Sequence, residues 1–293
     1  FEPRLGMKLN LSDNIRLKAS GGIYTQNFTS TKSDQDVVNL FTGFLSSPEE
    51  QLFDINGEEV LDNLQRAKHA IFGMEANLTR TLEVNAEVYY KQFDQLINVN
   101  RNKLFAIDPN YIVEAGSAYG FDILFKHDYK RLYAWAVYSH SYVNRNDGEQ
   151  IYPPHFDRRH NVNLVSSYKL GKDMSWEVSG RFNWGSAFPV TQEQGFYEQV
   201  NFDNGIDVNY LEENGILNTI YADEINGGRL SDYHRFDVSI KKTWTFINDM
   251  KLVANGSLTN VYNRKNIFYV NRLTKEEIYQ LPIIPSAGLS FEF

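Results

Sequence analysis

Residues 176–184 read W-E-V-S-G-R-F-N-W, and apolar and polar side chains alternate along this stretch. A period of two places alternate side chains on opposite faces of an extended strand. One face carries Trp176, Val178, Phe182 and Trp184, and the other carries Glu177, Ser179, Arg181 and Asn183. A strand with one apolar and one charged face fits either a half-exposed sheet or the wall of a β-barrel.

The same alternation recurs along the whole chain. It predicts eleven strands, at 3–11, 14–27, 66–79, 82–97, 111–127, 130–145, 157–170, 173–186, 231–247, 249–263 and 282–293. Many of them are longer than the roughly five to six residues of an average soluble strand. This length suits strands that cross a bilayer at a tilt of about 35–45°.

The connections between these strands alternate between short and long. The short ones are expected at Ser12-Asp13, Arg80-Thr81, Asp128-Tyr129, Gly171-Lys172 and Asn248-Asp249, and the long ones at 28–65, 98–110, 146–156, 187–230 and 264–281. Short turns at one end and long loops at the other are typical of outer-membrane barrels. We therefore predict an all-β fold, a transmembrane antiparallel β-barrel with long extracellular loops. A soluble sandwich or propeller is the alternative.

The strand count and the last strand both bear on how the barrel is completed and inserted. Eleven strands is an odd number, whereas bacterial single-chain barrels have even numbers, so we expect the C-terminal half of a larger barrel, with a part missing before Phe1.

In the last strand, Leu289, Phe291 and Phe293 share an apolar face. An alternating final strand that ends in Phe resembles the signal that outer-membrane assembly machinery recognises.

Composition excludes several other classes. The chain has 293 residues, no cysteine and a formal net charge of −8. No disulfide scaffold, thiolate metal site or cysteine nucleophile is therefore possible, and the acidic balance argues against a nucleic-acid partner. No apolar run approaches the ~18 residues of a transmembrane helix. No nucleophile elbow, phosphate loop, dinucleotide fingerprint or helical histidine pair occurs, so we expect neither an enzyme nor a cofactor.

Six motifs occur in a fixed order along the chain. They are L-Q-R-A-K-H at 64–69 with G-M-E at 73–75, A-Y-G-F-D at 118–122, W-A-V-Y-S-H-S-Y at 135–142, F-D-R-R-H-N at 156–161, D-Y-H-R-F-D at 232–237 and N-V-Y-N-R-K-N at 260–266. Their order and spacing resemble the C-terminal barrel of TonB-dependent outer-membrane receptors, in particular the Bacteroidetes type.

The resemblance implies a 22-stranded barrel with an N-terminal plug domain, of which residues 1–293 form the C-terminal part without the plug and the first half of the wall. It implies active uptake of a solute (siderophore, haem, glycan or peptide), with the TonB complex acting through the missing plug. Outer-membrane lipid, lipopolysaccharide and a surface lipoprotein are further candidate partners. A receptor-like barrel serving as an assembly subunit, a passive porin and a soluble carbohydrate-binding protein are the alternative functions.

Candidate site residues lie mainly in the loops. The two longest loops, 28–65 and 187–230, each carry eight acidic residues and one basic residue, and could attract cations or simply be solvated. Asp203 and Asp207 flank a glycine turn and are weak candidates for calcium ligands; a tight Asn-Gly turn is the alternative reading. The loop aromatics that could face a ligand are Phe41, Phe44, Phe196, Tyr197 and Tyr210.

The remaining predictions concern the wall and one loop. Arg235 and Asp237 are expected to face the lumen if Phe236 faces lipid, where they can pair with each other or with a plug. Interfacial girdles of aromatic residues are expected to include Tyr24, Tyr133, Trp135, Tyr168, Trp176 and Trp184. The S-P-E-E sequence at 47–50 has the pattern of a helix start and predicts a short surface helix near 48–54.

Overall fold

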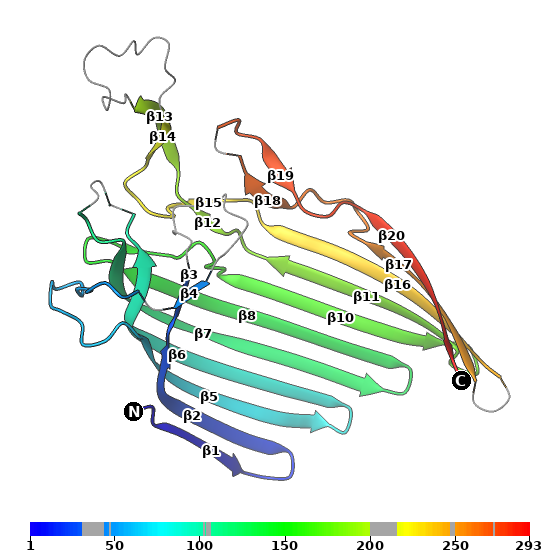
Figure 1. Cartoon of the computed structure of the whole chain (residues 1–293). Helices are drawn as coiled ribbons and strands as arrows, with labels where there is room; N and C mark the ends of the chain where they lie inside the picture. The colour runs from blue at the N-terminus through cyan, green and yellow to red at the C-terminus, as the bar shows by residue number, and fades with distance from the viewer. Residues whose placement is uncertain are drawn as a thin grey trace.

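The computed structural model describes residues 1–30, 44–46, 48–101, 103, 107–199, 216–246, 250–271 and 273–293. In this part of the chain, eleven strands lie side by side in chain order and form one broad antiparallel sheet (Figure 1). The strands are β1 (Arg4–Asn10), β2 (Ile15–Gln26), β5 (Gln65–Thr79), β6 (Leu82–Val99), β7 (Tyr111–Tyr129), β8 (Leu132–Asn146), β10 (His160–Leu170), β11 (Trp176–Gly185), β16 (Tyr233–Thr245), β17 (Lys251–Thr259) and β20 (Ile284–Glu292). The eleven-strand wall that the alternation predicts is confirmed.

Short strand pairs occupy the long connections. They are β3 (Phe28–Ser30) with β4 (Phe44–Ser46), β12 (Pro189–Val190) with β15 (Gly228–Arg229), β13 (Glu193–Gln199) with β14 (Ile216–Tyr221) and β18 (Ile267–Val270) with β19 (Glu277–Tyr279), and β9 (Ile151–Tyr152) extends β8. All of them lie beyond one end of the sheet, and the tight turns lie at the other end (Figure 1). No helix in the described residues is long and apolar enough to cross a membrane.

The strand register gives the sheet one apolar and one polar face. Phe182 on β11 lies opposite Leu164 on one neighbouring strand and Phe236 on the other. One position along, Arg181 lies opposite Asp237, which places both on the polar face because successive side chains point to opposite sides. We refer below to the apolar face, which carries Phe182, and to the polar face, which carries Arg181.

The apolar face is uncovered. Val88 on β6, Val178 on β11 and Leu289 on β20 are 52%, 40% and 77% exposed. The buried apolar cluster of the described residues, Leu52 with Ile97 and Val113, lies instead at the loop end of β6 and β7. Soluble monomers rarely expose contiguous apolar surface on this scale, so the sheet has the surface of a membrane wall rather than that of a soluble sandwich.

One turn lies two residues later than the sequence predicts. Asp128 and Tyr129 belong to β7, where Tyr129 pairs with Leu132. The turn is formed by Lys130, which has φ of 52°, and Arg131. A two-residue hairpin turn requires positive φ, usually supplied by Gly or Asn. Lysine supplies it here, so no residue type marked the turn. The turns at 12–13 and 80–81 lie where predicted. The connection after β10 is longer than the predicted two residues, because β10 ends at Leu170 and β11 begins only at Trp176. The turn at 248–249 lies outside the described residues.

The predicted helix near 48–54 is wrong, because this segment is irregular and ends in an isolated bridge between Phe53 and Glu59. The side-chain amide of Asn63 donates to the carbonyls of Pro48 (2.6 Å) and Glu50 (3.0 Å). The Glu50 carboxylate accepts the backbone N–H of Tyr111 at 2.9 Å. These long-range partners take the groups that a short helix would need, and helices of two turns are marginal without tertiary support.

Candidate functional site

Two rows of rings cross the apolar face. The row at the loop end contains Tyr119, His140, Tyr142, His160, Trp184 and Tyr262, and the row at the turn end contains Tyr129, Tyr168, Trp176, Trp244 and Phe291. Trp176 and Trp184 stand eight residues apart in β11, which is about 27 Å along a strand. At a tilt of about 40° the rows are about 21 Å apart across the membrane, close to the ~25 Å apolar band of outer-membrane barrels.

Three of the six predicted girdle residues lie on the apolar face, as a girdle requires, and the other three do not. Tyr168, Trp176 and Trp184 lie on the apolar face, whereas the register places Tyr24, Tyr133 and Trp135 on the polar face. Tyr24 there stacks on His69, with ring centroids 4.4 Å apart, and lies under Arg4. Residue type does not determine the face of a strand, because only the parity of a position relative to its neighbours does.

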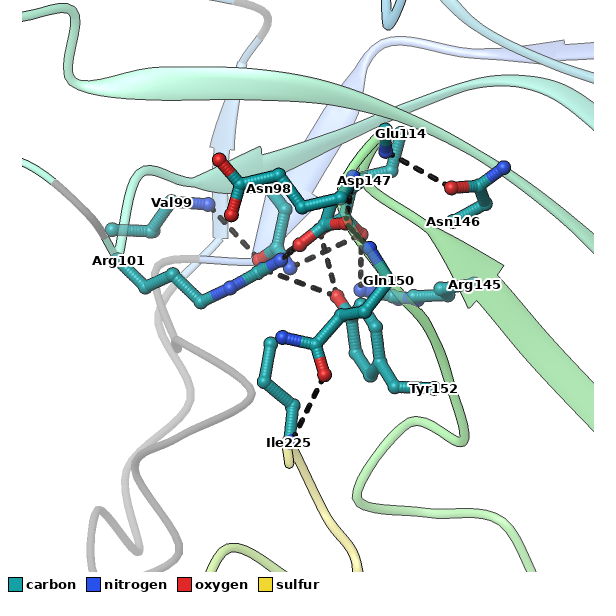
Figure 2. A network of polar contacts seen from close by, with 12 residues as sticks. Asn98, Val99, Arg101, Glu114, Arg145, Asn146, Asp147, Gln150, Tyr152 and Ile225 are labelled. Atoms are coloured by element: carbon teal, nitrogen blue, oxygen red, sulfur yellow. Dashed lines mark hydrogen bonds and ion pairs between the residues drawn. The ribbon is translucent and has the colours of Figure 1, made fainter. Parts of the chain in front are cut away.

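A cluster of buried charges lies at the loop end of β6, β7 and β8 (Figure 2). Arg101 donates through Nη1 to Glu114 Oε1 at 2.8 Å and pairs through Nη2 with Asp147. The side chains of these three residues are 2%, 0% and 4% exposed. Arg145 Nη1 lies 3.6 Å from Glu114 Oε2, and the Tyr152 hydroxyl donates to Glu114 Oε1 at 2.7 Å. Two cations and two anions balance one another, as a buried ionic cluster requires.

The pKa values of the loop members reflect this balance. Burial by itself lowers the pKa of Arg101, but Tyr152, Glu114 and Asp147 outweigh it, and the net effect raises that pKa. Burial raises the pKa of the Asp147 carboxyl, but the backbone N–H groups of Gln150 and Glu149 together with Arg101 hold the pKa below its usual range. Both shifts favour the charged forms, so Arg101 and Asp147 are charged at physiological pH.

The cluster extends to a loop that is distant in sequence. Gln150 Oε1 accepts the backbone N–H of Ile225 at 3.2 Å (Figure 2). Gln150 Nε2 donates to the Asp223 carbonyl at 3.2 Å. Asn226 Nδ2 donates to the Pro153 carbonyl at 2.9 Å. The long loops that follow β6, β8 and β11 are thus joined above the wall.

A second junction centres on Asp157, which is fully buried. Its Oδ2 pairs with Arg159 Nε and with Arg229 Nη2, each at 2.9 Å. Its Oδ1 accepts the backbone N–H of Val143 at 3.3 Å. The D-R-R-H motif therefore supplies a carboxylate that holds the loop after β11 against the ends of β8 and β10.

A third junction combines the last two motifs. Arg235 and Asp237 lie on the polar face and pair with each other at 3.0 Å. Asp237 Oδ1 accepts the backbone N–H of Asn260 at 2.9 Å. Asn260 is fully buried with φ of 54°, and its Nδ2 donates to the carbonyls of Arg264 and Leu281, each at 2.9 Å. Asparagine suits this position because it tolerates the left-handed conformation and hydrogen-bonds locally.

The candidate ligand-facing and calcium residues are only partly described. Tyr197 on β13 is 52% exposed, and the neighbouring Phe196 ring lies under the Lys275 ammonium at 5.1 Å. Phe44 lies in β4, but its side chain is outside the described residues, as are Phe41, Tyr210, Asp203 and Asp207. In the described ranges, no group of three or more His, Cys, Asp or Glu could hold a metal ion.

The last strand exposes its apolar residues. Leu289, Phe291 and Phe293 are 77%, 55% and 100% exposed, and the rings of Phe291 and Phe293 stack with centroids 6.1 Å apart. Among the described strands β20 pairs with β17 alone. The described part of β20 therefore combines a row of exposed apolar side chains with one edge that pairs with no other described strand.

The sequence did not single out Arg101, Glu114, Asp147 and Tyr152. One signal was present, since Glu114 interrupts the apolar residues of Y-I-V-E-A at the start of β7. An acidic residue in such surroundings is rarely buried unless it is paired. Its partners lie 13 to 38 residues away in the chain, and no periodicity identifies them.

No protein-family model matches the chain, and no curated protein matches it. Solved structures do. The ferripyoverdine receptor of the outer membrane of Pseudomonas aeruginosa is 14% identical with a TM-score of 0.60, over 96% of this chain and 31% of that one. BauA, the ferric preacinetobactin receptor from Acinetobacter baumannii, is 11% identical with a TM-score of 0.61, over 100% of this chain and 36% of that one. The outer membrane transporter YddB from Escherichia coli is 13% identical with a TM-score of 0.54, over 99% of this chain and 39% of that one.

These likenesses establish the fold. The chain has the fold of part of the antiparallel barrel wall of TonB-dependent outer-membrane receptors, and it spans roughly a third of the length of the solved receptors that it matches. The structures it resembles are receptors and transporters, not enzymes.

Proposed function

We propose that this chain forms wall and extracellular loops of a TonB-dependent outer-membrane receptor that takes up a solute. The observation that carries the proposal is the eleven-strand antiparallel sheet with an uncovered apolar face and all long loops at one end. This arrangement matches solved receptors over nearly the whole chain. Two rows of rings at a bilayer-like separation support the outer membrane as its location.

The domain organisation is a further part of this proposal. Residues 1–293 would be the C-terminal half of a 22-stranded barrel, with the plug and the first half of the wall preceding them. The strand count and the share of the solved receptors covered support this division. TonB would act through the plug, and lipopolysaccharide and a surface lipoprotein would contact the outer surface. A Bacteroidetes-type receptor rests on the six ordered motifs alone.

The transported solute belongs to the same proposal. Two of the similar structures are described as receptors for ferripyoverdine and ferric preacinetobactin, so a ferric complex is the first class to test. Haem, glycans and peptides follow, because the loops above a shared wall determine specificity. The paired buried charges of the loop junctions, such as Arg101 with Glu114 and Asp157 with Arg229, hold loops in place rather than face a solute.

The test uses the native polypeptide in its own cells. We expect it in the outer-membrane fraction, soluble only with detergent, with a mass about two to three times 33.9 kDa and plug sequence at its N-terminus. Deleting its gene should abolish accumulation of one solute, and deleting TonB should do the same. A product that is monodisperse without detergent would refute the membrane assignment. Uptake that persists without TonB would indicate a passive porin, and lost assembly of a partner complex with normal uptake would indicate an assembly subunit.

A further inference from the structure

Arg158 is a half-buried cation that lacks a carboxylate partner among the described residues. It precedes β10, and its guanidinium lies over the Phe188 ring at 4.1 Å and near the Tyr233 ring at 5.6 Å. Its Nε atom is buried and has no hydrogen-bond acceptor. Burial lowers the pKa of Arg158, and Tyr233 and Asp232 offset this effect only partly.

The neighbouring acidic groups are already engaged. The Asp157 carboxylate is shared by Arg159 and Arg229, so one anion already serves two cations. Asp232 Oδ1 accepts the backbone N–H of Ala187 at 2.9 Å and forms no ion pair with Arg158. A positive charge that is partly removed from water is therefore only partly compensated by Tyr233 and Asp232, and an anion supplied from outside would complete its pairing.

A glycine creates the space for this side chain. A Cβ atom on Gly185 would lie 2.5 Å from Arg158 Nη1 and 2.6 Å from Cζ. Gly185 pairs with Tyr233 across β11 and β16 and shares its face with Arg181 and Asn183, so the guanidinium lies on the polar face at the loop end of the wall. Arg159 extends to the opposite face, where it covers the Tyr142 ring at 4.0 Å.

We propose that Arg158, whose guanidinium lies over Gly185 and between the Phe188 and Tyr233 rings, is a binding site for the carboxylate of an anionic solute. A guanidinium offers two parallel N–H donors that match a carboxylate. The acidic residues of the long loops act on such a ligand only within about 8 Å, the screening length at physiological ionic strength. This inference rests on the proposed function, because the polar face becomes the lumen only in a closed barrel.

The test measures binding of benzoate, of its neutral analogue benzamide, and of inorganic phosphate to the full-length native receptor in detergent by saturation-transfer NMR. We expect benzoate to bind and Arg158→Gln to weaken it at least about ten-fold, the effect of losing a charge-assisted bidentate pair. Arg158→Lys should weaken benzoate binding less, because lysine keeps the positive charge but lacks the two parallel N–H donors of the guanidinium. Gly185→Ala should act like Arg158→Gln, because it displaces the guanidinium. Binding of phosphate but not benzoate would overturn the carboxylate assignment.

The matched control is Arg131→Gln, which removes an arginine from the tight turn at the opposite end of the sheet, where it donates to the Gly171 carbonyl at 2.7 Å. It should leave benzoate binding unchanged. Unchanged benzoate binding in Arg158→Gln would overturn the inference, and a loss of stability without a change in binding would show that an internal carboxylate occupies the site. Uptake and membrane location, measured for the same variants, test the proposed function separately. If uptake is normal and the variants do not change benzoate binding, the inference about Arg158 is refuted while the proposed function stands.

Discussion

Replacing Arg101 by Met should release the loops that meet at the buried ionic cluster. Removing one partner of a buried ion pair costs about 3–5 kcal/mol. Glu114 would keep the Tyr152 hydroxyl at 2.7 Å and Arg145 at 3.6 Å, so the lower end, about 3 kcal/mol, is expected. At about 1.4 kcal/mol per ten-fold change, amide hydrogen exchange in 146–156 should accelerate about 150-fold.

The assay is hydrogen exchange with mass spectrometry on the detergent-solubilised protein, since it reports local opening. The matched control is Arg16→Met. Arg16 lies 3.2 Å from Glu75 but is 34% exposed, and Glu75 keeps Lys18, so exchange nearby should change less than about five-fold. Asp147→Asn added to Arg101→Met restores the charge balance and should recover part of the protection. Exchange in Arg101→Met within about three-fold of the native protein would refute the reasoning.

Three further predictions follow from the loop junctions and the last strand. The pKa of Asp147 is lowered on folding. Its stabilising effect is therefore complete above the unfolded pKa of about 3.9 and is lost as the pH falls through the lower folded pKa. Protection of 146–156 from hydrogen exchange should accordingly stay constant from about pH 7 to 5. Asn260→Ala should cost at least about 3 kcal/mol, from the left-handed conformation and the lost hydrogen bonds, and should open 264–281 to proteolysis, whereas Asn260→Gly should cost less. Deleting Phe293 should reduce the inserted fraction in a heat-modifiability gel, and normal insertion would contradict its role as an insertion signal.

Much of the fold could be predicted from local patterns. Alternation places Phe182 and Arg181 on opposite faces without any knowledge of their neighbours, because the period of two belongs to each strand by itself. The strand count and the alternation of short and long connections follow from the same pattern. Prediction from local patterns failed at the Lys130 turn, because no glycine or asparagine marks that turn in the sequence. It also failed for Trp135, which was assigned to the girdle from its residue type although its position places it on the polar face.

The candidate site was predictable only where a motif marked it. The motifs contain Asp157, Arg235, Asp237 and Asn260, but their resemblance to a family does not show what each side chain contacts. The structure shows that these residues hold the loops to the wall. The segment 48–54 failed as a helix for the same reason: its polar groups bind partners far along the chain, and local propensity is weak against such contacts.

The architecture of this protein, with eleven amphipathic strands, two faces and loops at one end, follows from the order of its residues. The way in which the loops are held does not, because their contacts join residues that no periodicity relates. Gln150 reaches Ile225 across 75 positions, and Arg101 reaches Asp147 across 46. Side-chain alternation is a property of neighbouring residues, whereas charge balance in a buried cluster is a property of groups that meet only after the sheet has formed.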